Sequence, residues 1–376
     1  MAAASPIYLD YQATTPLAPE AYAAMLPWLG GPESAGGWAN PHSAHLLGRK
    51  ASAAVEVARG QIDALMPKGG RVIFTSGATE ALNLAIRGAL PALAPRRRIV
   101  TIATEHAAVR DTCLWLEAQG HDVVLLPVDC DGLVDMPAAR AAITPDTALV
   151  AAMLVNNEIG VIQPIEVLSD LAHAAGALFV CDAVQGFGRV ALPQAADMIA
   201  VTAHKIHGPK GIGALWVREG TALEPLIHGG GQEQGLRSGT LSPALCAGFG
   251  AAAKLAAQRA EEDAAHVAWL RDRALELFAG WQVNGSLSQR YPGNLNLRRD
   301  GLDVARLMSD VRGVAFSAGS ACASGSGRPS HVLTALGLSS AEVRSSIRLG
   351  FGRYTGIDEI ERAAHLIVDA ANRQMG

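Results

Sequence analysis

The sequence has few cysteines, little net charge and no long apolar run, and each absence excludes a class of protein. Its 376 residues include five cysteines, with no pair at metal-ligand spacing, so neither a disulfide framework nor a metal site is expected. A formal net charge of −4 gives no electrostatic basis for binding nucleic acid. Without a membrane-length apolar run or a signal peptide at the N-terminus, we expect a cytoplasmic protein with reduced thiols.

Short β-branched runs alternate with Ala-rich helical stretches through the first part of the chain. Seven of these runs are apolar on both faces, as strands of a parallel sheet covered by helices must be. This alternation predicts a doubly wound α/β sheet. Strands are expected at 72–74, 99–102, 123–126, 149–154, 177–180, 198–201 and 213–217, and helices at 80–90, 107–119, 136–142 and 165–175.

The pattern changes after a loop at 229–231, where a long Ala-rich helix is expected over 243–279. The remainder predicts a smaller α+β domain, with strands at 294–297, 314–316 and 346–349 and helices at 304–311 and 358–374. We therefore expect a large domain over 16–250. The small domain would combine 1–15 with 251–376.

Lys205 is the first candidate for chemistry. It follows the apolar run 198–201 and precedes a Gly/Pro turn. An amine at the exit of a buried strand loses its proton more easily than one on a solvated face, and a neutral amine forms a Schiff base with a carbonyl. Taken alone, a lysine in a polar loop is the commoner interpretation. Polar residues at four other strand ends favour the catalytic one.

Ligands of open α/β sheets bind beyond the carboxyl ends of the strands, where this chain has unusual polar residues. Residues 75–80 open a helix with small and hydroxyl side chains that suit either a phosphate or an ordinary cap. His106 is a packed residue, a helix cap or a catalyst, and Asn157 donates to a substrate or shapes a turn. Asp182 ends an apolar strand and needs a cation, either a protonated ring nitrogen or a structural arginine.

Together these groups match the needs of one cofactor. A phosphate cradle, an aromatic stacking partner, an acid for a pyridinium nitrogen and an amine for an aldehyde describe pyridoxal phosphate. The cofactor would supply an electron sink. The protein would supply orientation and the carboxylate that keeps the ring nitrogen protonated.

These residues resemble those of the cysteine desulfurases, members of the class V aminotransferase group with the fold-type I architecture. The resemblance covers nearly the whole chain and implies a mostly parallel seven-stranded sheet between helices plus a smaller α+β C-terminal domain. Its motifs are highly specific in combination. They lie at 8–16, 40–43, 75–80, 104–106, 155–160, 182–185, 204–213, 228–240, 319–322 and 345–348.

The resemblance implies a role for each candidate residue. Lys205 would hold the cofactor as a Schiff base, His106 would stack on the ring and move protons, and Asp182 would pair with the ring nitrogen. Asn157 and Arg348 would bind the substrate carboxylate. The remaining cofactor contacts would be Gln185 at the ring hydroxyl, Gly77, Ala78, Thr79, Thr202 and His204 at the phosphate, and Thr240 reaching across from the second subunit of a homodimer.

Cys322 lies in a Gly/Ser-rich run with little apolar anchorage, which predicts a flexible loop over about 317–330. Thiolate is the nucleophile, so exposure without adjacent acids favours a reactive cysteine there. Cys130 is expected in a turn whose acidic neighbours disfavour the thiolate. The other three are expected to be buried: Cys113, Cys181 and Cys246.

The resemblance implies that L-cysteine loses its sulfur to Cys322, leaving alanine and a Cys322 persulfide. The sulfur would pass to an acceptor protein, such as an iron–sulfur scaffold. A class V aminotransferase needs no loop thiol, so Cys322 counts against that alternative, whereas a selenocysteine lyase could use the same residues. A catalytically silent relative is the third alternative, and the presence of Lys205 and Asp182 counts against it.

Overall fold

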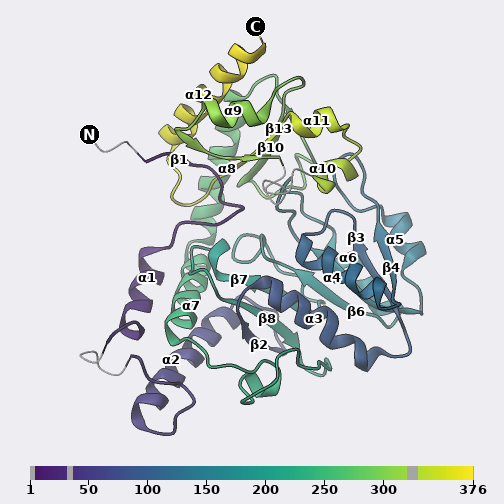
Figure 1. Ribbon diagram of the computed structural model, residues 1–376, viewed down its shortest axis with the longest axis vertical. Helices are drawn as coiled ribbons and strands as arrows, with labels where there is room; N and C mark the ends of the chain where they lie inside the picture. The colour runs from purple at the N-terminus through teal and green to yellow at the C-terminus, as the bar shows by residue number, and fades with distance from the viewer. Residues whose placement is uncertain (1–4, 32–36, 320–328, 376) are drawn as a thin grey trace.

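The computed structural model describes residues 5–31, 37–319 and 329–375 of the chain. Its centre is a seven-stranded sheet with the strand order β2-β8-β7-β6-β5-β3-β4 (Figure 1). Strand β8 runs antiparallel to both neighbours and the other pairs are parallel, so the sheet is mostly parallel, as predicted. The strands are β2 (Gly70–Thr75), β3 (Arg98–Ile102), β4 (Asp122–Leu126), β5 (Thr147–Met153), β6 (Leu178–Asp182), β7 (Met198–Thr202) and β8 (Gly213–Arg218).

Successive residues of each strand face opposite sides of this sheet, so each side has a core of its own. Phe74 belongs to a core that includes apolar residues of α2, α6 and α7. Ile73, one residue earlier, belongs to a second core formed with α3 and α4. The sheet therefore lies between two helical layers. The helices are α2 (Leu46–Asp63), α3 (Ala78–Leu93), α4 (Ala107–Ala118), α5 (Met136–Ala142), α6 (Ile165–Ala174) and α7 (Pro243–Gln258).

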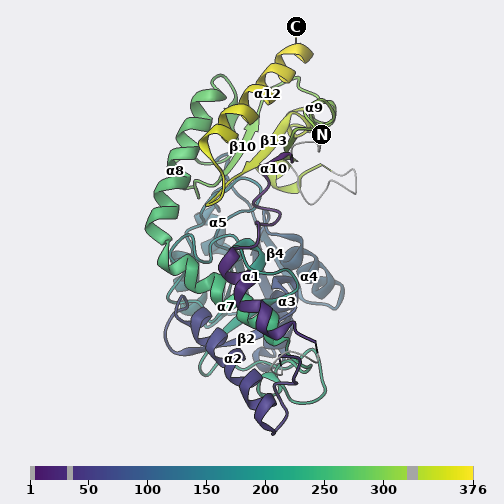
Figure 2. The same cartoon turned by 90° about the vertical axis from the view of Figure 1, so that its left-hand side faces the viewer.

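The single helix predicted over 243–279 is wrong, because α7 ends at Gln258 and a separate α8 (Ala260–Leu277) follows. Arg259 between them has φ −109° and ψ 11°, which is not helical. Its guanidinium donates to Glu262 at 2.8 Å in the first turn of α8, where three acidic residues complement the helix dipole. Figure 2 shows α8 leading from α7 to the C-terminal part of the molecule, beside α12 (Ile357–Met375).

The C-terminal part contains a four-stranded antiparallel sheet with the order β12-β13-β10-β9. The strand predicted over 314–316 divides: β11 (Val314–Ala315) pairs in parallel with β1 (Ile7–Tyr8), and β12 (Ser317–Ala318) joins the larger sheet. The N-terminal residues thereby pack with the C-terminal part. The remaining elements are β9 (Gln282–Val283), β10 (Asn294–Arg298), β13 (Ser346–Gly350), α9 (Val304–Asp310), α10 (His331–Ala335) and α11 (Ser340–Arg344).

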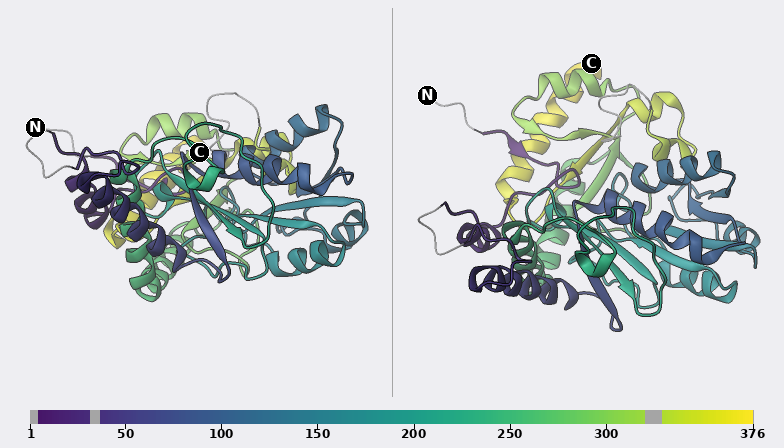
Figure 3. Two further views of the ribbon diagram at one scale, coloured as in Figure 1. Left: turned by 90° about the horizontal axis from the view of Figure 1, so that it is seen from below. Right: turned by 60° about the horizontal axis from the view of Figure 1, so that its bottom comes forward.

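Two helices near the N-terminus lie outside the predicted pattern. α1 (Pro19–Met25) and α2 both pack against α7, and α2 also contacts the edge strand β2 (Figure 3). The side chain of His45 caps α2 by accepting from the amide of Gly48 at 3.2 Å. Histidine is not among the residues that usually mark a helix start, so the sequence gives little sign of this boundary. Three short 3-10 turns complete the described elements, at Leu26–Trp28, Ala203–Lys205 and Glu233–Gly235.

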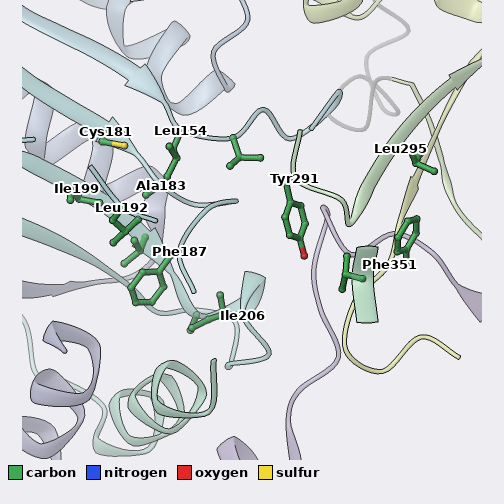
Figure 4. Packing of buried hydrophobic residues seen from close by; sticks show 14 of the residues in the cluster. Leu154, Cys181, Ala183, Phe187, Leu192, Ile199, Ile206, Tyr291, Leu295 and Phe351 are labelled. Atoms are coloured by element: carbon green, nitrogen blue, oxygen red, sulfur yellow. The ribbon is translucent and has the colours of Figure 1, made fainter. Parts of the chain in front are cut away.

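The two sheets share one continuous apolar cluster. Phe187 and Ile206, beside the large sheet, belong to the same cluster as Tyr291, Leu295 and Phe351, which come from the C-terminal part (Figure 4). Burial of such side chains contributes roughly 1.5–3 kcal/mol each, so the two parts are held together by their core. No helix of the described ranges combines the length and apolarity needed to cross a membrane.

Glu105 is an acid within this fold that is fully buried, at 0% exposure. Its Oε1 accepts from the amide of Met153 at 2.7 Å, and its Oε2 has no hydrogen-bond partner among the described residues. Burial raises the pKa of Glu105 well above 4.5, and the negative charge of Asp182 raises it further. The carboxyl is therefore protonated in the folded protein at pH values where it ionises in the unfolded chain.

This raised pKa predicts a pH-dependent effect of Glu105→Gln on stability. Above pH 4.5 the folded state holds a proton that the unfolded chain releases, so the parent loses stability as pH rises, by about 1.4 kcal/mol per pKa unit of displacement. Glu105→Gln cannot ionise and is expected to gain stability relative to the parent as the pH rises above 4.5, until Glu105 ionises in the folded parent. Urea unfolding at several pH values measures this, with the exposed Glu117→Gln as control. A variant-to-parent difference that is constant with pH would contradict it.

Candidate active site

A pocket of about 590 Å³ opens at the edge of the large sheet where its parallel strands end. Strands β2, β3, β5, β6 and β7 all point their carboxyl ends toward it, and N-terminal residues 12–14 form part of its wall. Eleven of the predicted site residues line this one pocket: Gly77, Ala78, Thr79, His106, Asn157, Asp182, Gln185, Thr202, His204, Lys205 and Arg348.

The N-terminus of α3 forms one end of the pocket. Strand β8 passes directly behind it, since a Cβ on Gly213 would lie 2.7 Å from the carbonyl carbon of Gly77. Glu80 accepts from the amide of Ser76 at 2.7 Å and from Nε of Arg237 at 2.7 Å. Burial would raise the pKa of Glu80, but these hydrogen bonds outweigh it and lower the pKa. The first turn of α3 is thus held rigidly, with its amides available to an anion.

Lys205 ends the turn that follows β7, and its amine reaches the N-terminal segment. Nζ donates to the carbonyl of Ala13 at 2.8 Å and to the carbonyl of Gln12. Next to it, Nδ1 of His204 lies 3.2 Å from the hydroxyl of Thr14. Burial and the charge of Lys205 lower the pKa of His204 to about 4, so its imidazole is neutral at pH 7.

Asp182 ends β6 and is 4% exposed. Its Oδ1 accepts from the amide of Val184 at 2.9 Å. Burial raises the pKa of Asp182, while this hydrogen bond and the positive charge of Lys205 oppose the rise. Within the described ranges no arginine forms an ion pair with Asp182, so the structural-arginine alternative is not what the fold provides.

His106 is both a helix cap and a pocket residue. Its Nδ1 accepts from the amide of Ala108 at 3.1 Å at the start of α4, and the side chain lines the pocket. The cap fixes one ring nitrogen as an acceptor and thereby sets the direction of the ring. Of the three interpretations left open by the sequence, the helix cap is therefore present, and it is compatible with a role in the pocket.

Arg189 lies behind the pocket wall, and no sequence motif predicts a role for it. Its guanidinium donates to Oε1 of Gln185 at 3.1 Å and to the carbonyl of Lys205. The side-chain Nε2 of Gln185 in turn donates to the carbonyl of Gln12 at 2.9 Å. Because one cation contacts both residues, it fixes the backbone of Lys205 relative to the side chain of Gln185.

Arg348 lies on β13 and is 1% exposed, although it reaches the pocket wall. Nη1 donates to the carbonyl of Asn157 at 3.0 Å, and Nη2 donates to Asp10 at 2.6 Å. Asp10, which lies in the motif 8–16 but for which the sequence predicted no role, therefore holds one side of the guanidinium. Nε has no hydrogen-bond partner in the described part of the chain, which leaves a buried donor available beside Asn157.

Two predicted residues remain to be placed. Cys322 lies outside the described residues. Thr240 is exposed and does not line the pocket of its own chain.

The other cysteines are placed as predicted, with Cys113, Cys181 and Cys246 buried and Cys130 exposed. Over the residues that the structure covers, no cluster of His, Cys, Asp and Glu could hold a metal ion.

Comparison with known proteins identifies the family of the chain. The class-V aminotransferase family model matches residues 7–363. The chain is 43% identical to the cysteine desulfurase IscS of Rickettsia bellii, over 98% of this chain and 92% of the relative. It is 41% identical to IscS of Rickettsia rickettsii, over 96% and 90% of the two chains.

Solved structures show the same fold. A NifS-like protein superposes with a TM-score of 0.89 at 29% identity, covering 98% of this chain and 99% of its own. SspA in complex with cysteine gives 0.81 at 36% identity, covering 93% and 99%. The predicted fold-type I architecture is confirmed, and the chain belongs to the class-V aminotransferase family and, within it, to the cysteine desulfurases.

Proposed function

We propose that this chain uses pyridoxal phosphate to remove sulfur from L-cysteine, and that Cys322 receives the sulfur as a persulfide. The observation that carries the proposal is the convergence of the Lys205 amine, the buried Asp182 carboxyl and the N-terminus of α3 on one pocket. A volume of about 590 Å³ is within the range of small-ligand sites. The reducing cytoplasm would keep Cys322 as a thiol.

The pocket residues fit the cofactor group by group. The amides of Gly77 and Ala78 and the hydroxyl of Thr79 would receive the phosphate, together with His204 as a neutral donor. Thr202 now donates its hydroxyl to the carbonyl of Ile212 at 3.1 Å, so it would change acceptor to contact a phosphate oxygen. These donors surround the positive end of a helix, where a phosphate is favoured.

At the other end of the pocket, Asp182 would hold a proton on the ring nitrogen and Gln185 would contact the ring hydroxyl. His106 would stack on the ring. When bound, pyridoxal phosphate supplies a ring that withdraws the electrons left when the substrate loses its α-proton. Asp182 suits this role because burial removes the water that would otherwise screen its charge.

The chain's own groups would then handle protons and sulfur. The Lys205 amine would bind the cofactor's aldehyde and, once displaced, take the α-proton. Arg348 and Asn157 would hold the substrate carboxylate. Cys322 Sγ would attack the substrate sulfur, so that an S–S bond forms as the Cβ–S bond breaks and leaves its electron pair on the carbon skeleton. One proton added at Cβ and one returned to Cα would then give alanine. The persulfide would pass to an acceptor protein, such as one in iron–sulfur cluster assembly.

Cys322→Ser tests the sulfur nucleophile. The variant is expected to bind L-cysteine and to change the absorbance of the cofactor, because the pocket is intact, but to carry no persulfide by mass spectrometry. Cys130→Ser is the matched control, since this thiol is exposed in a turn away from the pocket. Sulfide release by Cys322→Ser at the parent rate under reducing conditions would refute the role.

Arg348→Lys tests the carboxylate site. Lysine loses the two-donor edge of the guanidinium, and a charge-assisted hydrogen bond contributes about 1.5–3 kcal/mol. The KM for L-cysteine is therefore expected to rise about 10- to 100-fold with a smaller change in kcat. The control is Arg344→Lys, four residues earlier and exposed on α11. An unchanged KM in steady-state assays would remove Arg348 from the site.

We also infer a homodimer in which Thr240 completes the phosphate site of the second subunit, a proposal supported by its exposure outside its own pocket. Thr240→Ala is expected to lower the affinity for pyridoxal phosphate. Co-expression with Lys205→Ala tests the direction: a mixed dimer regains one intact site if Thr240 acts across the interface. Activity of differently tagged mixed dimers at limiting cofactor measures this, and no recovery would mean that Thr240 acts within its own subunit or not at all.

A further inference from the structure

Glu158 is linked to both flanks of the stretch 320–328, which contains Cys322: directly to Ser330 on one side, and through Asn296 to Gly319 on the other. On the C-terminal side, Oε2 of Glu158 accepts from the hydroxyl of Ser330 at 2.5 Å. On the N-terminal side, Nδ2 of Asn296 donates to the carbonyl of Gly319 at 3.4 Å and to the carbonyl of Glu158 at 3.1 Å. One residue, Glu158, is therefore linked through its side chain to one flank and through its backbone to the other.

These contacts are buried and held in place from behind. Glu158 and Ser330 are both 2% exposed, and Asn296 is 0% exposed. The side-chain oxygen of Asn156 accepts from the amide of Glu158 at 2.8 Å, which fixes the turn. Asn284 donates to Oδ1 of Asn296 at 2.8 Å and sets the direction of its amide. Buried polar groups that are satisfied in this way are rigid.

The same turn is part of the proposed substrate site. The carbonyl of Asn157 accepts from Arg348 at 3.0 Å and from Nδ2 of Asn294 at 3.2 Å. Asn157 and Arg348 line the pocket, whereas Glu158 does not. The residue adjacent to the proposed carboxylate ligand is thus the one that binds the flank of the Cys322 stretch.

Ser330 makes a second contact, with the first turn of α10. Its hydroxyl oxygen accepts from the amide of Leu333 at 3.0 Å and so caps α10, while its O–H donates a hydrogen bond to Glu158. The start of α10 is therefore attached to the substrate-side turn. A hydroxyl at this position is needed for both contacts.

We propose that Glu158 is a positioning residue, which acts through Ser330 to fix the C-terminal flank of the Cys322 stretch relative to the substrate carboxylate site. Asn296 does the same for Gly319 on the other flank. The proposal rests on the proposed function, because it takes Cys322 as the sulfur acceptor. It assigns to the glutamate of the turn a role in the sulfur-transfer step and none in binding cysteine.

The test measures two steps separately in the purified holoenzyme. The absorbance change of the bound cofactor on adding L-cysteine reports binding, and rapid-quench mass spectrometry reports persulfide on Cys322. Glu158→Ala and Ser330→Ala are expected to bind cysteine with the parent half-saturation and to form persulfide about 10- to 100-fold more slowly, as for a displaced reacting group. Glu158→Gln and Ser330→Thr keep an acceptor and a hydroxyl, and are expected near the parent rate.

Ser339→Ala is the matched control. Ser339 caps the next helix, α11, by accepting from the amide of Glu342 at 3.3 Å, without contacting Glu158. It should lose a cap and keep the parent rate of persulfide formation. Hydrogen exchange at residues 331–336 should quicken in Glu158→Ala and stay unchanged in Ser339→Ala.

The outcomes separate the two proposals. If the parent itself forms no persulfide on Cys322, the proposed function fails. If the parent forms it and both alanine variants match its rate, or if they slow only as much as Ser339→Ala, the positioning role fails. Loss of the cysteine-induced absorbance change in Ser330→Ala, without rescue by Ser330→Thr, would also overturn the role.

Discussion

The arrangement of the site depends on the N-terminal segment, which joins the two sheets and closes the pocket. Strand β1 pairs with β11 in the C-terminal part, and the side chain of Gln12 donates to the carbonyl of Gly293 at 2.8 Å. A few residues later, the hydroxyl of Thr15 donates to the carbonyl of His204 at 2.9 Å. The carbonyls of Gln12 and Ala13, which accept from the Lys205 amine, belong to this same short segment. A short extended segment thus fixes the amine and couples it to both parts of the fold.

A second constraint is electrostatic. Three carboxyl groups lie buried around the pocket, and burial raises the pKa of each. The pKa of Glu105 and that of Asp182 lie above their usual values, and the pKa of Glu158 rises to about 7 against the hydrogen bond from Ser330 and the charge of Arg348. Two adjacent buried acids cannot both ionise at low cost. Because Glu105 is protonated, the negative charge falls to Asp182, the carboxyl that lines the pocket, where a cationic ring nitrogen would stabilise it.

Much of the fold and of the pocket wall could be predicted from the sequence, because both depend on local order along the chain. Apolar strands identify the sheet, and a parallel sheet brings the residues after each strand to one edge, which is how His106, Asp182 and Lys205 meet. The break at Arg259 and the start of α2 could not be predicted. The first depends on one non-helical residue within a helical composition, and the second on a histidine cap.

The positions of the supporting residues could not be predicted for a different reason: their partners lie far away in sequence, and some of these partners are backbone carbonyls. Asp10 reaches Arg348 across 338 residues, and Ser330 reaches Glu158 across 172. Carbonyls of Asn157 and Lys205 orient the two arginines, and every residue type presents the same carbonyl. Motifs therefore identify the side chains that would touch a cofactor, whereas the groups that aim those side chains emerge only when the chain is folded. Substitutions at the supporting residues are therefore expected to displace the reacting groups without removing any of them. For this reason, cysteine binding and persulfide formation must be measured separately.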